Sequence, residues 1–178
     1  MPLYVKVSSL INTITRTITK SKDLTQTKQA MKIENRVILL VEDNVSDVEL
    51  TKRALLKEHI MNEVVVAEDG QEALNYIFGE GSYQGRNVEQ QPSLVLLDIN
   101  LPIIDGIEVL RRIRTDPRTH RQVVVILTSS KEEQDVVKSY DLGVNSYIRK
   151  PVDFNQFSEA IKYLGLYWLV INEPPPSI

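Results

Sequence analysis

The sequence predicts an α/β protein with a doubly wound, five-stranded parallel sheet and five helices. Two observations support this fold class. Short apolar runs such as Val37–Val41 and Leu94–Leu97 are typical of strands that are buried on both faces of a parallel sheet. Segments with apolar residues at helical spacing separate these runs. Because strands and helices alternate along the chain, the strands are expected to lie parallel, joined by right-handed crossovers.

The predicted strands are short and stop at polar or turn-forming residues. Their ranges are 37–41, 63–67, 94–97, 123–127 and 145–149. Pro102 prevents any regular element from continuing far beyond the third strand, and Pro151 ends the fifth.

The predicted helices begin at or just after turn and capping residues, which are Ser46, Asp69-Gly70, Asp105-Gly106, Glu132 and Asp153. The segment 79–92 is expected to be a polar loop. In the last helix the apolar residues recur at three- and four-residue steps: Phe154, Phe157, Ile161, Leu164 and Trp168.

The composition is that of a globular protein of ordinary size. The 178 residues include 42% hydrophobic and 25% charged residues, which suits one domain with a buried core and a tail. The net charge of −3 offers no general basic patch for nucleic acid or a membrane surface. No apolar run approaches the ~20 residues of a membrane span. The absence of cysteine excludes disulfides and thiolate metal sites and fits a reducing compartment, so we expect a cytoplasmic protein.

Three segments differ in composition. Residues 1–33 are expected to be a disordered extension, or sequence that precedes a true start at Met31. The first 30 residues are rich in Ser and Thr and carry a charge of +4, from five basic residues and one acid. The repeat Leu10, Ile14, Ile18 leaves a basic amphipathic helix or a transit peptide as alternatives. Residues 34–172 are the expected domain, and residues 173–178 are a proline-rich tail.

Polar side chains gather at the carboxyl ends of the predicted strands. Glu42 and Asp43 follow the first strand, Asp98 the third, Thr128 the fourth and Lys150 the fifth. In a doubly wound sheet these ends share one edge, where such folds bind their ligands. Two carboxylates ~4 Å apart repel by ~4 kcal/mol at an effective dielectric near 20, so three acids at this edge require a cation. Oxygen ligands without Cys or His favour Mg²⁺.

These residues together suggest phosphoryl chemistry. A carboxylate such as Asp98, kept ionised beside Mg²⁺ and Lys150, can attack phosphorus and form an acyl phosphate. Thr128 and Lys150 would then bind the phosphoryl oxygens. The simple alternative for Asp98 is a turn or helix-capping aspartate, and the other polar residues at the same edge argue against it.

Five motifs make the chain resemble the receiver domains of two-component response regulators. They are Val-Glu-Asp-Asn at 41–44, Leu-Leu-Asp-Ile-Asn-Leu-Pro at 96–102, Asp-Gly at 105–106, Leu-Thr-Ser-Ser at 127–130 and Tyr-Ile-Arg-Lys-Pro at 147–151. Their order and spacing agree with the family over about residues 36–171. The resemblance implies the flavodoxin-like receiver fold with strand order 2-1-3-4-5, and a protein that accepts a phosphoryl group from a sensor histidine kinase.

The resemblance also implies a metal site. Asp98 is the expected phosphoacceptor. Asp43, Asp98 and the backbone carbonyl of Asn100 are the expected Mg²⁺ ligands, with Glu42 acting through a water molecule.

A conformational switch is implied as well. Thr128 and Lys150 are expected to bind the phosphoryl group, and Tyr147 is the expected switch aromatic. Lys150–Pro151 is expected to be a cis peptide bond, which an X–Pro sequence makes accessible. Phosphorylation would draw Thr128 towards the new group, let Tyr147 turn inward, and reshape the face formed by the fourth helix, fifth strand and fifth helix.

A narrower resemblance is to the stand-alone regulators that pair with bacterial and cyanobacterial phytochromes. It rests on Glu-Gly-Ser-Tyr at 80–83, Ser-Tyr-Asp-Leu-Gly-Val-Asn-Ser-Tyr at 139–147, and Trp168 in a long last helix. It implies a phytochrome as a candidate kinase and a homodimer through the face named above. No output domain is expected after Ile171, so the signal would leave through dimerisation, a binding partner or onward relay of the phosphate.

Two other functions stay open. An aspartyl-phosphate phosphatase or phosphotransferase would use the same nucleophile, but such hydrolases usually place a second acid two residues later, where this chain has Asn100. A receiver that acts as an unphosphorylated scaffold would not need Asp43, Asp98, Thr128 and Lys150. Beyond self-phosphorylation and autodephosphorylation, no enzyme activity is expected.

Overall fold

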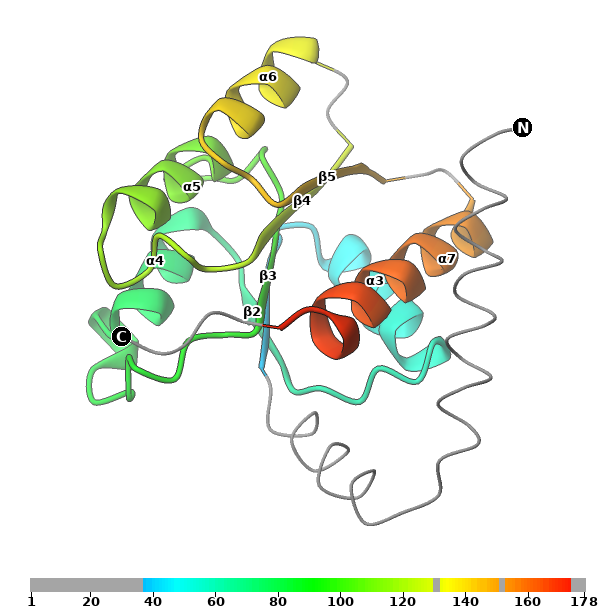
Figure 1. Ribbon diagram of the computed structural model, residues 1–178, viewed down its shortest axis with the longest axis horizontal. Coiled ribbons are helices and arrows are strands. Elements are labelled where there is room, and N and C mark those ends of the chain that lie inside the picture. Colours follow the sequence, from blue (N-terminus) through cyan, green and yellow to red (C-terminus); the bar gives the residue numbers. More distant parts are fainter. Residues whose placement is uncertain (1–36, 130–131, 151–152, 174–178) are drawn as a thin grey trace. The chain divides into compact units, whose positions relative to one another are not determined.

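The computed structural model describes residues 37–129, 132–150 and 153–173 (Figure 1). They belong to one compact unit, Asn35–Ile178. The predicted extension at 1–33 and the proline-rich tail beyond Glu173 lie outside the described residues. Pro151 lies outside them too, and with it the expected cis peptide bond.

In the described part of the chain, five strands form one parallel sheet in the order β2-β1-β3-β4-β5. This confirms the predicted fold class and strand order. The strands are β1 (Ile38–Val41), β2 (Val64–Ala67), β3 (Leu94–Leu97), β4 (Val124–Thr128) and β5 (Ser146–Arg149), each within one residue of its predicted limits.

Helices cover both faces of the sheet. Helices α3 (Val45–Lys57) and α7 (Phe154–Gly165) lie on one face, and α4 (Gly70–Phe78), α5 (Gly106–Thr115) and α6 (Glu133–Asp141) lie on the other (Figure 1). A 3₁₀ turn, η1 (Gly81–Tyr83), forms within the predicted loop 79–92. Among the described residues, no helix is both long enough and apolar enough to span a membrane.

Helix starts are fixed by polar side chains that accept hydrogen bonds from first-turn backbone N–H groups, which otherwise have no partner. Asn44 caps α3 in this way. Asp69, Asp105 and Asp153 do the same for α4, α5 and α7.

The core lies on both faces of the sheet, as strand β1 shows. Ile38 and Leu40 pack with buried residues of α3 and α7, while Leu39 and Val41 pack with those of α4 and α5. All four side chains are at most 1% exposed. Because both faces of the central strands are covered, polar chemistry is confined to the strand ends.

Helix α7 continues into a π-helical turn, η2 (Leu166–Ile171). The N–H of Asn172 donates to the carbonyl of Tyr167, five residues back, at 2.7 Å. This wider turn moves the inward-facing position along the chain. Leu169, which the predicted pattern left out, is buried, while Trp168 packs half-buried at the margin of the core.

Candidate functional site

Two neighbouring strands end at the same level and bring two acids side by side. In the register of β1 and β3, Val41 lies opposite Leu97, so Glu42 and Asp98 are the next residues on adjacent strands. The N–H of Asp98 donates to the Val41 carbonyl at 3.0 Å, which holds the two chains together beyond the sheet. The fold therefore places these carboxylates at the centre of the carboxyl edge.

Glu42, Asp43 and Asp98 form an acidic cluster. One carboxylate oxygen of each lies within 4.8 Å of the other two. Glu42 and Asp98 are buried, and Asp43 is exposed. Carboxylates this close repel one another unless positive charge lies between them. Three hard oxygen donors, one of them open to solvent, suit Mg²⁺, which binds carboxylates while keeping several of its waters.

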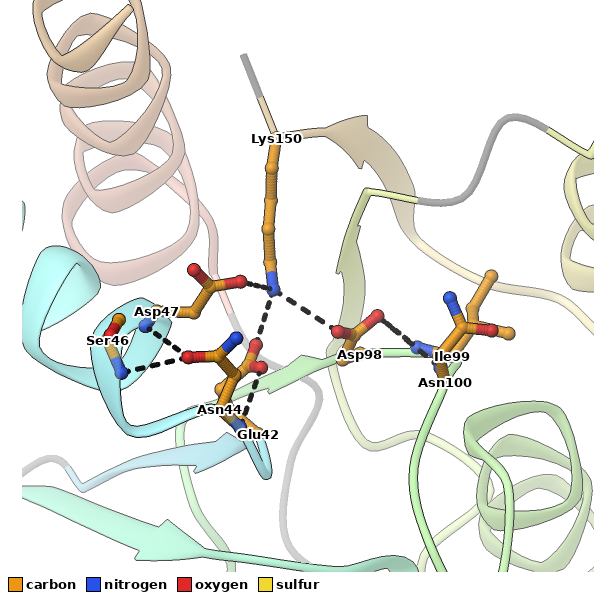
Figure 2. A network of polar contacts seen from close by, with 8 residues as sticks. All are labelled: Glu42, Asn44, Ser46, Asp47, Asp98, Ile99, Asn100 and Lys150. Carbon is orange, nitrogen blue, oxygen red and sulfur yellow. Dashed lines mark hydrogen bonds and ion pairs between the residues drawn. The ribbon is translucent and has the colours of Figure 1, made fainter. Parts of the chain in front are cut away.

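Lys150 brings positive charge into this cluster from the end of β5 (Figure 2). Its Nζ lies 2.5 Å from Glu42 Oε2, 2.8 Å from Asp47 Oδ2 and 3.2 Å from Asp98 Oδ2. The lysine side chain is 7% exposed. A buried ammonium is stable only with such partners, because each unpaired charge would keep a large desolvation cost.

Burial and the contact between Glu42 and Lys150 shift the pKa values of both groups. Burial raises the pKa of the Glu42 carboxyl above its usual range, although the hydrogen bond and charge of Lys150 act in the opposite direction. Burial alone would lower the pKa of Lys150, but hydrogen bonds to Asp47 and Glu42 and the charge of Asp98 outweigh it and raise that pKa. Lys150 is therefore a permanent cation at neutral pH.

The Asp98 carboxylate is oriented by its own loop. Its Oδ1 atom accepts the backbone N–H of Ile99 at 2.6 Å and lies 3.5 Å from the N–H of Asn100, while Oδ2 faces Lys150 (Figure 2). Both carboxylate oxygens thus have donors from fixed directions. A side chain held in this way presents an anionic oxygen to an incoming electrophile.

Residues 38–162 match the family described as the response regulator receiver domain. This chain belongs to that family. The predicted family is therefore confirmed, and the site described above lies within the matched residues.

Similar proteins include regulators associated with phytochromes, as the narrower resemblance predicted. Response regulator Rcp1 of Synechocystis is 37% identical over 134 residues, covering 75% of this chain and 89% of Rcp1. The crystal structure of the phosphorylated cyanobacterial phytochrome response regulator RcpA has 41% identity and a TM-score of 0.73, over 80% of this chain and 99% of that one. The bacteriophytochrome response regulator AtBRR has 54% identity and a TM-score of 0.64, over 79% and 99%.

Rcp1 is also represented by a crystal structure of its Mn²⁺-bound form. That structure has 36% identity and a TM-score of 0.72, over 79% of this chain and 99% of Rcp1.

Two further predicted residues lie on strands β4 and β5. Thr128 ends β4 with no exposed surface, and its carbonyl accepts the N–H of Lys150 at 2.8 Å. Tyr147 lies on β5, half-buried against the core on the side of α4 and α5, with its hydroxyl oxygen enclosed. Asn100 is exposed in the loop after Asp98. The roles of these residues and the Asn100 carbonyl ligand stay predictions.

Asp47 is the site residue that sequence reasoning missed. It lies in the first turn of α3, and its carboxylate contacts Lys150 (Figure 2). The available signal was the capping residue Asn44, whose side chain accepts the N–H groups of Ser46 and Asp47. Because that cap places the start of α3 directly after Glu42 and Asp43, an acid in the first turn of α3 lies close to the carboxyl edge of the sheet.

Proposed function

We propose that this receiver accepts a phosphoryl group from a sensor histidine kinase on Asp98. The observation that carries the proposal is the meeting of Asp43, Asp98 and Lys150 from three separate strand ends. In the reaction an Asp98 carboxylate oxygen forms a bond to phosphorus, the bond from phosphorus to the donor histidine nitrogen breaks, and its electron pair returns to the imidazole. We propose no catalysis beyond this self-phosphorylation and the later hydrolysis.

We infer that Mg²⁺ is the cofactor, held by Asp43, Asp98 and the Asn100 carbonyl, with Glu42 acting through water. The ion would supply positive charge for the phosphoryl oxygens. The donor set of the cluster and the Mn²⁺-bound form of Rcp1 support a divalent cation here.

The protein's own groups would bind and sense the phosphoryl group. Lys150 would donate to one of its oxygens and Thr128 would move towards another, because the modification adds roughly −1.5 to −2 charges at neutral pH. Tyr147 lies on β5, which pairs with β4, the strand that ends at Thr128. Tyr147 would follow the movement of Thr128 and change the face formed by α6, β5 and α7.

The test is labelling by acetyl phosphate with and without Mg²⁺. The wild type should be labelled with Mg²⁺ and should lose the label in excess EDTA, while Asp98→Asn should take up none. Asp141→Asn, the same substitution at an exposed position on α6, is the control and should label normally. Equal labelling of wild type and Asp98→Asn would overturn the proposal.

The kinase is proposed to be a phytochrome, because RcpA and AtBRR are described as phytochrome and bacteriophytochrome response regulators. A purified bacteriophytochrome kinase should then transfer phosphate to this receiver much faster than a histidine kinase without a photoreceptor domain. Equal rates from both kinases would contradict this assignment.

We also propose a homodimer through α6, β5 and α7, without nucleic-acid binding. Two exposed apolar residues on α6, Val137 at 59% and Tyr140 at 55%, support the dimer. Val137→Lys should shift the sedimentation coefficient towards the monomer. Leu56→Lys, at a residue of α3 that is 62% exposed, is the matched control and should leave the dimer intact.

A further inference from the structure

Asp47 and Asp98 contact the same lysine, Lys150. An ammonium has three N–H donors. Among the described residues, Lys150 directs them at three carboxylates, and Asp98 is the most distant at 3.2 Å. The donor that now faces Asp98 can pass to a phosphoryl oxygen on that residue, and Lys150 can supply a second donor only if its contact with Glu42 or Asp47 weakens.

The three carboxylates differ in how easily they can release the lysine. Glu42 is 2% exposed, and its other oxygen accepts the N–H of Asn44 at 3.2 Å, so it is enclosed and fixed on both sides. If Glu42 released Lys150, a buried carboxylate would be left without its cation.

Asp47 can release Lys150 at little cost. Its side chain is 32% exposed, so water can replace the ammonium. It also lies in the first turn of α3, where the helix dipole and the free N–H groups stabilise a carboxylate independently of Lys150. Of the three contacts, this is the one that solvent can substitute.

We propose that Asp47 is a positioning residue that holds Lys150 before phosphorylation and gives it up to the phosphoryl group afterwards. This inference rests on the function proposed above and adds a regulatory contact to it. Asp47 acts against phosphorylation because it occupies a donor of Lys150 that a phosphoryl oxygen would otherwise receive. The residue thus limits how readily the receiver is modified.

The test uses Asp47→Asn, which removes the charge but keeps the shape. Beryllofluoride binds to carboxylate oxygens as a stand-in for the phosphoryl group. At saturating Mg²⁺, Asp47→Asn should bind it about threefold to tenfold more tightly than wild type and be labelled faster by acetyl phosphate to a similar degree. Saturating Mg²⁺ removes any contribution from altered metal affinity.

Glu49→Gln is the matched control. It removes the same charge from α3, but Glu49 is paired with Lys52 at 3.8 Å rather than with Lys150. This variant should stay within about twofold of wild type, because exposed charges are well screened. A gain of equal size in Glu49→Gln would show a general charge effect and overturn the proposed role of Asp47.

A double-mutant cycle tests whether Asp47 acts through the lysine. In a Lys150→Met background, Asp47→Asn should no longer tighten beryllofluoride binding. A gain that persists without Lys150 would contradict the proposal. Because this background could impair folding, circular dichroism in Mg²⁺ checks it first, and the single variants remain decisive without it.

The outcomes separate this inference from the proposed function. If the wild type takes up no Mg²⁺-dependent label, the proposed function fails. If the wild type is labelled on Asp98 but Asp47→Asn binds beryllofluoride no better, the role of Asp47 fails and the proposed function stands.

Discussion

The start of α5 touches the backbone of the proposed phosphoacceptor. A β-carbon built on Gly106 would lie 2.0 Å from the Asp98 carbonyl oxygen and 2.9 Å from its carbonyl carbon. The N–H of Gly106 also donates to the Ile99 carbonyl at 2.9 Å. The position of Asp98 therefore depends on the absence of a side chain at residue 106.

Gly106→Ala should damage both stability and labelling. The methyl group has to displace backbone rather than a flexible side chain, which should lower the free energy of unfolding by about 1–3 kcal/mol. The same displacement should turn Asp98 away from Lys150 and slow labelling by acetyl phosphate. Urea unfolding and labelling rates measure the two effects.

Gly85→Ala serves as the comparison. Gly85 has φ +91° and open space where the methyl group of an alanine would lie, so the change should cost about 1 kcal/mol from backbone strain and leave labelling unchanged. Normal labelling and stability in Gly106→Ala would contradict the packing argument.

Removing the buried ammonium should make stability depend on a divalent cation. Lys150→Met leaves Glu42 and Asp98 together without their cation, which should cost about 3–5 kcal/mol of unfolding free energy in EDTA. Mg²⁺ should restore part of that loss, because it supplies positive charge to the same carboxylates. Urea titrations in EDTA and in Mg²⁺ measure the difference.

Lys52→Met is the control for this variant. Lys52 is exposed and lies 3.8 Å from Glu49, so its loss should change stability by no more than about 1 kcal/mol and should not alter the Mg²⁺ effect. If Lys150→Met were as stable as Lys52→Met in EDTA, the ammonium would not balance the acidic cluster.

Two surface carboxyls that pair with arginines, on and after α5, should contribute to stability above pH 4. Hydrogen bonds from Arg111 and Arg112 lower the pKa of Glu108 to about 2, and those from Arg118 lower the pKa of Asp116 to about 2. A carboxyl whose folded pKa lies below its unfolded value stabilises the fold above the unfolded value, near 4, and loses that contribution as the pH falls towards 2.

The double variant Glu108→Gln/Asp116→Asn measures this contribution. The arginines are well exposed, so solvent screening keeps the contribution of the three pairs small. The variant should be less stable than wild type at pH 6 and should approach it at pH 2. A constant difference across this range would contradict the pKa argument.

The acidic cluster could be predicted from the sequence because it follows from topology. Once five strands are parallel in the order 2-1-3-4-5, the residues after β1, β3, β4 and β5 meet at one edge whatever the details of packing. Glu42, Asp98 and Lys150 are such residues, and their contacts appear in the structure.

Asp47 could not be predicted in the same way. Its contact with Lys150 depends on the orientation of α3, which is set by the Asn44 cap and by the packing of α3 against α7. Sequence periodicity identifies the buried face of a helix, but not which exposed first-turn residue reaches a neighbouring strand end. Such details depend on tertiary packing.

The π-helical turn at the end of α7 is a second feature that sequence periodicity does not predict. An α-helical pattern selected Trp168, but η2 turns Leu169 inward, where it is 3% exposed. Leu169→Ala should therefore lower the free energy of unfolding by about 2–4 kcal/mol through lost burial and a cavity. Val170→Ala, at a neighbour that is 41% exposed, should change it by less than about 1 kcal/mol. Equal costs for the two variants, measured by urea unfolding, would mean that the helix continues with α-helical spacing to its end.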